Sequence, residues 1–258
     1  MYFESHAHYD DTCFDTDREE LLASFQENGV DYVINVGADI PASRASVKLA
    51  EDYGFIYAAV GVHPHSADTL NEDGFKALEK LCGMPKVAAL GEIGLDYYYD
   101  NSPRDSQRYW FKRQLELAGG LNLPVIIHSR EAAAETFSII ENSGVRRGVI
   151  HCYSGSAPMA LEYTKMGFYI GVGGVITFDN TRKLKEAVEA IPMENILLET
   201  DSPYLAPVPY RGGRNNSNYL TFIAAKIAEI KGISLQDAAN TTFSNAIKVF
   251  NIKPETIS

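Results

Sequence analysis

The sequence predicts an α/β fold, a single (β/α)8 TIM barrel with a metal site at the carboxyl ends of its strands. Three observations favour it. Strand-like and helix-like stretches alternate along 258 residues, eight apolar runs suit buried parallel strands, and metal-binding side chains follow several of these runs. The predicted strands span residues 2–6, 31–37, 55–61, 86–92, 124–128, 148–152, 168–172 and 196–200.

Two helical stretches between these runs carry clear patterns. In residues 16–28, Thr16 and Glu19 have the spacing of a capping box, and Gly29 suits the end of the helix. Residues 104–121 place their apolar side chains on one side of a helix. That side consists of Phe111, Leu115 and Ala118, widened by Leu117 and Leu121.

A doubly wound open sheet is the rival fold, because alternation alone does not distinguish it from a barrel. The candidate metal ligands follow the first, fourth, fifth, sixth and eighth predicted strands. An open sheet would spread them widely, whereas a closed barrel brings all five strand ends to one mouth. The barrel is therefore favoured, and the lack of a linker or low-complexity tract predicts one domain over residues 1–258.

The composition restricts the possible partners and compartment. A net charge of −11 argues against tight, non-specific duplex binding, although bound divalent ions would reverse the charge locally. No apolar stretch reaches the roughly 18 residues of a membrane span, and the N-terminus lacks the basic segment of a secretory signal. We therefore expect no membrane association. Cys13, Cys82 and Cys152, without a C-x-x-C pair, indicate reduced thiols and a cytoplasmic location.

The histidines carry the functional prediction. Taken singly, each has an ordinary explanation as a core residue, and Glu92 and Asp201 have explanations as a strand-end salt bridge and a loop cap. Taken together they do not, because every histidine of the chain falls in a motif at the end of a predicted strand. His6 and His8 are two residues apart, so on an extended backbone both can face one ion. The candidate metal ligands are His6, His8, Glu92, His128, His151 and Asp201.

The chemistry of these ligands narrows the kind of site. Imidazoles and carboxylates without thiolates suit Zn, Mn, Fe, Co or Ni, and they suit Mg less. Structural zinc sites use ligands at short local spacing, often cysteines. Six ligands dispersed over most of the chain predict instead a catalytic centre that holds two divalent metal cations.

These motifs together resemble the TatD-related metal-dependent deoxyribonucleases, a branch of the amidohydrolase-type barrel hydrolases, over essentially the whole chain. The resemblance implies that His6, His8 and Asp201 hold one ion, that His128 and His151 hold the second, and that Glu92 bridges them. The matching stretches are Ser5-His6-Ala7-His8, Gly61-Val62-His63-Pro64-His65, Leu90-Gly91-Glu92-Ile93-Gly94-Leu95-Asp96-Tyr97, Leu123-Pro124-Val125-Ile126-Ile127-His128-Ser129-Arg130, His151-Cys152-Tyr153-Ser154-Gly155 and Leu198-Glu199-Thr200-Asp201-Ser202-Pro203-Tyr204-Leu205-Ala206-Pro207.

The sequence departs from the family pattern at several positions outside the metal ligands. Glu4 stands where an aspartate is usual, and Tyr153 replaces a common phenylalanine. Gly213 replaces a usual lysine, and Asn216-Ser217 replaces a usual Glu-Pro pair. These departures bear on substrate preference more than on catalysis.

The expected mechanism gives Asp201 and Glu92 catalytic roles. Asp201 is the candidate general base for a metal-activated water, and Glu92 keeps the two ions together. The candidate substrate-binding residues are His63, Arg130, Tyr204, Arg211 and Arg214. Structural alternatives stay open: His63 can fix its own loop, and Arg211 and Arg214 can form salt bridges. Tyr204 or Tyr97 can stack on a base, but Tyr97-Tyr98-Tyr99 is expected to serve packing rather than to form a platform for a nucleobase.

The resemblance implies a phosphodiesterase whose substrate is DNA, working from the 3′ end of single strands. A second hypothesis keeps the metal centre but has it hydrolyse a small amide, lactone or phosphoester. A carboxylated lysine often bridges the ions in those relatives, whereas Glu92 occupies this place here. A third hypothesis is a non-catalytic metal-binding or regulatory module. Such a module would have lost one of the metal ligands, whereas all six candidates are present here. No obligate protein partner is expected.

Overall fold

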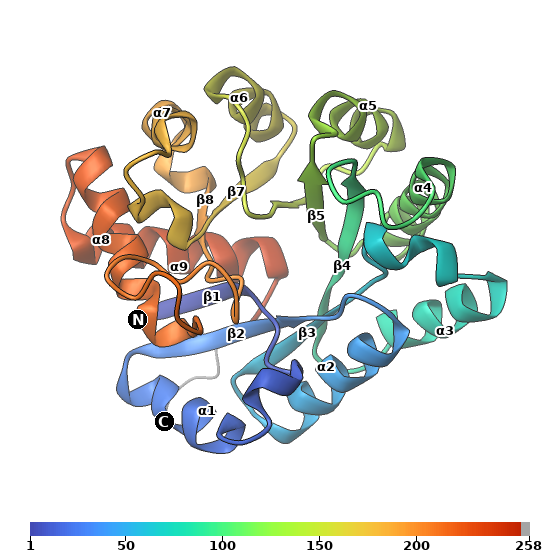
Figure 1. Ribbon diagram of the computed structural model, residues 1–258, viewed down its shortest axis with the longest axis horizontal. Helices are drawn as coiled ribbons and strands as arrows, with labels where there is room; N and C mark the ends of the chain where they lie inside the picture. Colours follow the sequence, from blue (N-terminus) through green and yellow to red (C-terminus); the bar gives the residue numbers. More distant parts are fainter. Residues whose placement is uncertain (254–258) are drawn as a thin grey trace.

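Eight parallel strands follow one another around a ring in the order of the sequence (Figure 1). The computed structural model of the chain describes residues 1–253, so the last five residues of the predicted domain lie outside it. This architecture confirms the predicted barrel. The strands are β1 Tyr2–Ala7, β2 Val30–Val36, β3 Ile56–Val60, β4 Val87–Asp96, β5 Val125–Arg130, β6 Gly148–Ile150, β7 Phe168–Val172 and β8 Ile196–Leu198.

The ring closes between its first and last strands by a few contacts at the carboxyl end. Ala7 and Ser202 form a parallel bridge. The amide of Asp201 donates to the carbonyl of His6 at 2.9 Å, and the amide of His8 donates to the carbonyl of Ser202 at 2.8 Å. The closure therefore runs directly through two of the predicted metal-binding motifs.

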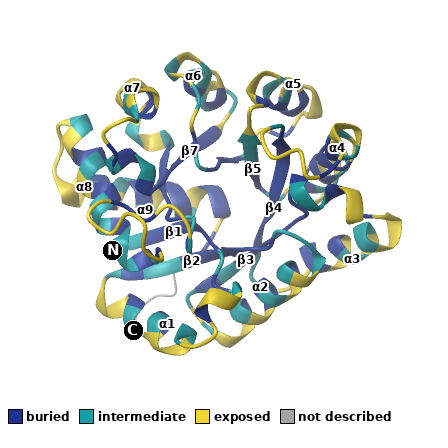
Figure 2. Cartoon of the chain, viewed as in Figure 1, coloured by how far each residue is buried: buried dark blue, intermediate teal, exposed yellow. Residues whose placement is uncertain are grey.

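The helices before the last one form an outer layer around the strands, with their buried sides toward the sheet (Figure 2). Their apolar side chains pack against the outward-facing residues of the strands, such as Val33, Ile127 and Ile170. The helices are α1 Arg18–Glu27, α2 Ile40–Asp52, α3 Glu72–Cys82, α4 Arg104–Leu121, α5 Ala133–Ser143, α6 Ala157–Lys165, α7 Arg182–Ala190, α8 Leu220–Lys231 and α9 Leu235–Phe250.

One residue from each strand contributes to a layer inside the barrel, and α9 covers this layer. Phe3 of β1 stacks on Phe250 of α9, with ring centroids 5.8 Å apart. The amide of Asn245 donates to the carbonyls of Met193 and Ile196, which holds the start of β8. The amino end of the barrel is thereby filled, whereas the carboxyl mouth is open to a ligand. The interior layer consists of Phe3, Ile34, Ala59, Ala89, Ile126, Val149, Tyr169 and Leu197.

The predicted elements differ from the structure mainly at their ends. Helix α4 has its predicted bounds, but Leu121 is 44% exposed and does not widen the apolar side. Helix α1 begins at Arg18, and its N-cap is Asp17 without a side-chain capping bond, so the capping box expected from Thr16 was wrong. The carboxylate of Asp17 instead accepts hydrogen bonds from Arg214. A tertiary contact has replaced the local one.

In the part of the chain that the structure describes, no helix is long and apolar enough to cross a membrane.

Candidate metal centre

A local irregularity in β4 places Glu92 inside the mouth. The fourth strand continues to Asp96 rather than ending at Glu92 as predicted. Its pairing with β5 shifts between Leu90 and Ile93, so β4 has one more residue than its partner there. Such a bulge redirects a side chain. Gly94 allows the close approach that follows, because a Cβ at this position would lie 1.9 Å from the carbonyl oxygen of His128.

The two oxygens of Glu92 face different groups of histidines. Oε2 lies 3.4 Å from Nε2 of His6 and 4.0 Å from Nε2 of His8. Oε1 lies 2.9 Å from Nδ1 of His128 and 3.6 Å from Nε2 of His151. The carboxylate, which is almost fully buried, therefore stands between the two predicted ligand sets.

The first set suits a single ion. Nε2 of His6 and Nε2 of His8 are 3.2 Å apart, and Oδ1 of Asp201 lies 3.5 Å from Nε2 of His8. Ligand atoms bound at about 2.0–2.2 Å from one zinc ion are roughly 3–3.5 Å apart, so these separations fit a shared ion. The carbonyl of Val36 accepts from Nδ1 of His8 at 2.7 Å, which leaves Nε2 of that ring as the ligand atom.

Oε1 of Glu92 faces His128 and His151, the expected ligands of the second ion, and also His63. Nε2 of His63 lies 3.6 Å from Oε1 of Glu92. Nδ1 of His63 accepts a hydrogen bond from the amide of His65 at 3.1 Å, so the neutral ring carries its proton on Nε2. This arrangement makes His63 a hydrogen-bond donor toward the cavity rather than a metal ligand. It also fixes the loop, which was the alternative role expected for His63.

Two further carboxylates hold the imidazoles from behind. Oδ2 of Asp96 lies 3.1 Å from Nε2 of His128 and 2.9 Å from Nε2 of His65. Oε1 of Glu199 lies 3.3 Å from Nδ1 of His151 and accepts from the amide of Cys152 at 2.6 Å. Carboxylates that hold the second ring nitrogen of a ligand histidine are a regular feature of metal sites.

Glu199 occupies a space made for its carboxylate. A Cβ at Gly171 would lie 2.2 Å from Oε2 of Glu199, so only glycine leaves room there. Three buried atoms of this part of the centre lack a hydrogen-bond partner among residues 1–253: Nδ1 of His6, Nδ1 of His151 and Oε2 of Glu199. The rings of His6 and His151 stack with centroids 3.6 Å apart. Buried polar atoms rarely stay unpaired, so this arrangement requires protons or ions to balance it.

The pKa values follow from burial and from the crowding of charges. Burial raises the pKa of Glu92, but the charge of His151 and the hydrogen bonds from His128 and His6 outweigh it and hold this pKa well below its usual range. Burial likewise raises the pKa of Asp201, and His151 and His8 bring it below the ordinary value. Both carboxylates are therefore ionised at neutral pH. Burial lowers the pKa of His63 to about 3, so its ring is neutral.

His8 and His151 are shifted in the opposite direction. Burial lowers the pKa of His8, but its hydrogen bond to Asp201 and the charge of that residue raise it to about 9. Burial also lowers the pKa of His151, but the charges of Glu199 and Glu92 raise it to about 10. In the absence of ions these rings hold protons at neutral pH. A divalent cation would take the place of those protons, and the residues present therefore fit a metal centre.

The centre opens into a cavity of about 590 Å³. Of the predicted substrate-binding residues, His63, Arg130 and Tyr204 line this cavity, whereas Arg211 and Arg214 do not. Arg214 donates to Asp17 at 2.8 Å and to the carbonyl of Cys13 at 2.7 Å, which is the structural role left open for it. The guanidinium carbon of Arg211 lies 4.3 Å from the ring centroid of Phe178. A phosphate contact by Arg211 stays a prediction.

The three consecutive tyrosines do not behave alike. Tyr97 packs against the core and donates to Glu135 at 2.6 Å, as expected of a packing residue. Tyr98 and Tyr99 are 59% and 54% exposed, and Tyr99 lines the cavity. The expectation that all three serve packing was therefore wrong for Tyr98 and Tyr99, because the loop turns outward after Asp96.

The unusual Glu4 supports the first metal motif from inside the barrel. Its buried carboxylate accepts from the amides of His6 and Thr200, at 3.1 and 2.8 Å, and from the hydroxyl of Thr200 at 2.6 Å. The hydroxyl of Ser217 donates to it at 2.8 Å. Two positions that depart from the family pattern, Glu4 and Ser217, thus contact each other directly and tie the loop after β8 to the His6 motif.

The sequence alone did not predict a role in the centre for Asp96, Glu199 or His65. The signal that identified Glu92 was a charged residue within an apolar run. The same signal was present at Glu199, which follows Ile196-Leu197-Leu198, and at Asp96, which follows Gly94-Leu95. His65 was recognised within its motif but was given no role of its own.

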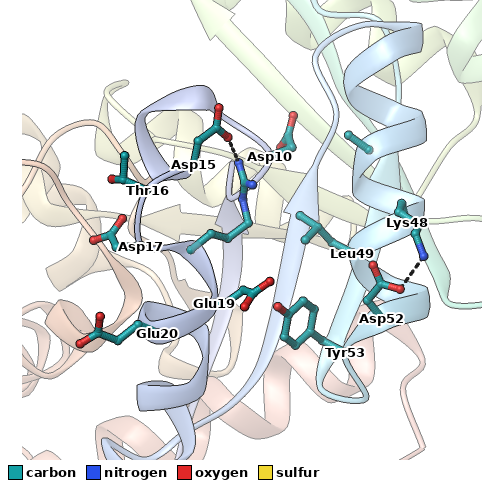
Figure 3. Close-up of a pocket in the computed structure, with 12 residues that line it drawn as sticks. Asp10, Asp15, Thr16, Asp17, Glu19, Glu20, Lys48, Leu49, Asp52 and Tyr53 are labelled. Carbon is teal, nitrogen blue, oxygen red and sulfur yellow. Dashed lines mark hydrogen bonds and ion pairs between the residues drawn. The ribbon is translucent and has the colours of Figure 1, made fainter.

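A second, larger hollow lies between α1 and α2 (Figure 3). Its volume is about 730 Å³, and carboxylates make up much of its lining. Arg18 pairs with Asp15 at 2.6 Å and Lys48 pairs with Asp52 at 2.5 Å, and all four side chains reach solvent. We call this hollow the acidic groove. It is lined by Asp10, Asp15, Thr16, Asp17, Arg18, Glu19, Glu20, Ala45, Lys48, Leu49, Asp52 and Tyr53.

Comparison with known proteins gives a consistent result. The family described as "TatD related DNase" matches residues 3–251. The metal-dependent hydrolase YabD of Bacillus subtilis, named as uncharacterized, is 41% identical, covering 98% of this chain and 100% of the relative. A protein of Citrobacter rodentium named 3′-5′ ssDNA/RNA exonuclease TatD is 32% identical, covering 93% of this chain and 94% of the relative.

A solved structure shows the same likeness. The crystal structure of YJJV, a TatD homolog from Escherichia coli, superimposes with a TM-score of 0.93. The two chains are 29% identical, and the match covers 98% of each.

Proposed function

This chain belongs to the TatD-related family of metal-dependent hydrolases, and from that premise we propose that it hydrolyses phosphodiester bonds of single-stranded DNA from the 3′ end. The observation that carries the proposal is the position of Glu92, whose two oxygens face two groups of histidines in one cavity. The name of the Citrobacter rodentium relative supports a nucleic-acid substrate.

The proposed cofactors are two divalent cations. His6, His8 and Asp201 would hold one, His128 and His151 the other, and Glu92 would bind both. Bound divalent ions supply Lewis acidity, neutralise charge on a phosphoryl group and lower the pKa of water. Mg, Mn, Zn and similar ions are the candidates, and the imidazole-rich donors favour the transition metals over Mg.

Asp201 is the proposed general base. It lies at the end of β8 with a left-handed φ of +57°, a conformation that aspartate tolerates better than most residues and that turns its side chain into the mouth. Its carboxylate is ionised at neutral pH because His151 and His8 keep its pKa below the ordinary value despite burial. It can therefore accept a proton from the attacking water.

His63 and Arg130 are the proposed phosphate-binding groups. Nε2 of His63 carries a proton and faces the cavity, and it can donate to a non-bridging phosphate oxygen. Arg130 follows His128 by two residues and is the only lysine or arginine among the described residues that line the cavity. A guanidinium presents paired donors that match a phosphate. Together they would hold the scissile group beside the ligand cluster.

The bridging position supports a nuclease over an amide- or lactone-hydrolysing enzyme. Those relatives often bridge their ions with a carboxylated lysine, and no lysine lines the cavity in residues 1–253. Glu92 occupies the bridging place. The free thiols of Cys13, Cys82 and Cys152 support a reducing, cytoplasmic location. We propose DNA as the partner of this site and invoke no protein partner.

The direct test uses end-labelled oligonucleotides with purified protein. Single- and double-stranded DNA, each labelled at the 5′ or the 3′ end, are incubated with Mg²⁺, Mn²⁺, Co²⁺ or Zn²⁺ and with a chelator as control. We expect stepwise shortening of the single strand from its 3′ end, abolished by the chelator. If no labelled strand is cut with any metal while a small amide, lactone or phosphomonoester is hydrolysed, the proposed substrate is wrong.

A further inference from the structure

The mouth of the barrel contains an aromatic surface whose two tyrosines have no role in the proposed chemistry. It consists of Tyr98 and Tyr99, in the loop after β4, and Arg130, at the end of β5. Both tyrosines are more than half exposed. Leaving a large aromatic side chain in water is unfavourable compared with burying it against a ligand. Tyrosine and arginine are also common anchors at binding surfaces. We call these three residues the tyrosine platform.

The tyrosine platform is built as a rigid unit. The guanidinium carbon of Arg130 lies 4.1 Å from the ring centroid of Tyr98 and 4.7 Å from that of Tyr99. The two rings meet edge to face, with centroids 5.0 Å apart. The amides of Tyr98 and Tyr99 each donate to Oδ1 of Asp96 at 2.9 Å. A preorganised surface of this kind loses little entropy when it binds a ligand.

The same aspartate ties the tyrosine platform to the metal centre. While Oδ1 of Asp96 holds the loop, Oδ2 lies 3.1 Å from Nε2 of His128. The ring of Tyr99 stands edge-on to His65, with centroids 5.3 Å apart, and both residues line the cavity. Arg130, one of the two proposed phosphate-binding residues, lies 4.7 Å from the ring centroid of Tyr99, so a group stacked on Tyr99 would be next to the bound phosphate.

Charge decides what kind of ligand suits this surface. Arg130 makes no ion pair with a carboxylate in the described part of the chain, whereas nearby Arg104 pairs with Asp100 at 2.9 Å. A cavity with one guanidinium, in a chain of net charge −11, can gain little affinity from a run of phosphates. Stacking must therefore supply much of the remaining binding free energy, and a base can stack on a tyrosine only when it is unpaired.

We propose that Tyr99, supported by Arg130 and Tyr98, stacks on the unpaired nucleobase next to the scissile phosphate. This inference rests on the proposed function and adds the reason for a single-stranded end. Tyr204 stands on the other side of the mouth, because β8 is four strands from β4 in a ring of eight. Tyr204 is also 54% exposed, so the single strand passes between two aromatic walls.

The test compares one pair of substrates across matched variants. Two single-stranded 10-mers differ only in the nucleotide at the cleaved end, which carries either thymine or an abasic tetrahydrofuran. For the wild type we expect kcat/KM to fall roughly 5- to 100-fold on the abasic strand, the loss of one stacked base. Tyr99→Leu should lose this preference while cutting the abasic strand at the wild-type rate. Tyr99→Phe should keep the preference.

Two controls separate the tyrosine platform from a structural role and from the chemistry. Tyr109→Leu removes another half-exposed tyrosine, on α4 and outside the cavity, and should behave like the wild type. Calorimetric Mn²⁺ affinity of Tyr99→Leu should equal that of the wild type. If Tyr99→Leu slows the cleavage of both strands equally, or of neither strand, the proposed role of the tyrosine platform is wrong.

A binding measurement covers the case in which no strand is cut. Fluorescence anisotropy with Asp201→Asn and Mn²⁺ compares the affinity of the two 10-mers. Stronger binding of the thymine strand, lost on adding Tyr99→Leu, would keep the tyrosine platform while the wild type's inactivity rejects the proposed hydrolysis. Equal binding of the two strands would reject the tyrosine platform whether or not DNA is cut.

Discussion

The mouth of the barrel and the acidic groove are both rich in carboxylates, yet their carboxylates differ in what surrounds them. The acidic groove is the larger, at about 730 Å³ against about 590 Å³, and Asp10 contributes to both. In the groove, Asp15 and Asp52 have side chains 57% and 46% exposed and pair with nearby cations on the surface. In the mouth, the side chain of Glu92 is 5% exposed and faces imidazoles from several strands.

Burial, more than size, therefore distinguishes the candidate site from the acidic groove. An exposed carboxylate is stabilised by water, and a surface ion pair adds little to stability. A buried carboxylate needs partners, and bringing five histidines to within ion-pair distance of Glu92 has a cost in desolvation and repulsion. A protein keeps such an arrangement when something binds there.

Replacing Asp201 tests the mouth most severely. Asp201→Asn keeps the size of the side chain but removes the charge of a proposed metal ligand and the proposed base. We expect kcat on single-stranded DNA to fall by about 100- to 10,000-fold, the usual contribution of a general base. Circular dichroism should show an unchanged fold. Near-normal turnover would mean that the base lies elsewhere.

Replacing Glu199 tests whether buried carboxylates behind the ligands contribute to metal binding. Glu199→Gln removes the charge that faces Nδ1 of His151 while keeping the volume that Gly171 allows. We expect Mn²⁺ affinity to fall about 10- to 100-fold, as when such outer carboxylates are lost elsewhere. Calorimetry measures it, with the exposed Glu194→Gln as the matched control. Equal affinities for the two variants would contradict this role.

The number of protons released on metal binding gives a further test of the buried charges in the mouth. The charges of Asp201 and Glu199 raise the pKa of His8 to about 9 and that of His151 to about 10 against the effect of burial. Below these values each ring holds a proton that a metal must displace, so metal affinity should rise with pH and level off above them. Each ring should contribute up to about tenfold per pH unit.

Calorimetry in two buffers with different ionisation enthalpies counts these protons. A positive number of protons released at pH 7, decreasing toward pH 10, is the expected outcome. Metal affinity that does not change between pH 6.5 and 9 would show that both rings are already neutral.

A substitution in the acidic groove should have the smallest effect. Asp52→Asn removes one carboxylate of that hollow and its exposed pair with Lys48. We expect kcat/KM and the melting temperature to stay within experimental error, because exposed ion pairs contribute little. Activity assays and thermal unfolding beside the wild type measure both. A clear loss of activity would show that the groove, too, belongs to the functional surface.

The sequence predicted the strands well because their apolar runs are long and continuous. All eight were placed correctly to within a few residues. The largest error was at β4, which was expected to stop at Glu92 and instead continues to Asp96. A bulge cannot be recognised from an apolar run, because it depends on the register with β5.

The candidate ligands were predictable because imidazoles at strand ends are distinctive. Their supporting carboxylates were not, since Asp96 and Glu199 gain their roles only from neighbours on other strands. The same reason explains why the roles of Arg214 and Tyr99 could not be predicted from the sequence. Whether an arginine meets Asp17 or a phosphate, and whether a tyrosine packs or faces the cavity, depends on the path of a loop.

The amino-acid sequence was sufficient to predict the alternation of strands and helices, the set of six candidate ligands and the family. Each of these predictions follows from local composition or from motifs that can be recognised in the sequence alone. The folded chain was needed to show that Glu92 faces both groups of histidines, that Glu4 contacts Ser217, and that Tyr99 lines the cavity. The reason is physical: these features are distances between strands remote in sequence, and ring closure sets them.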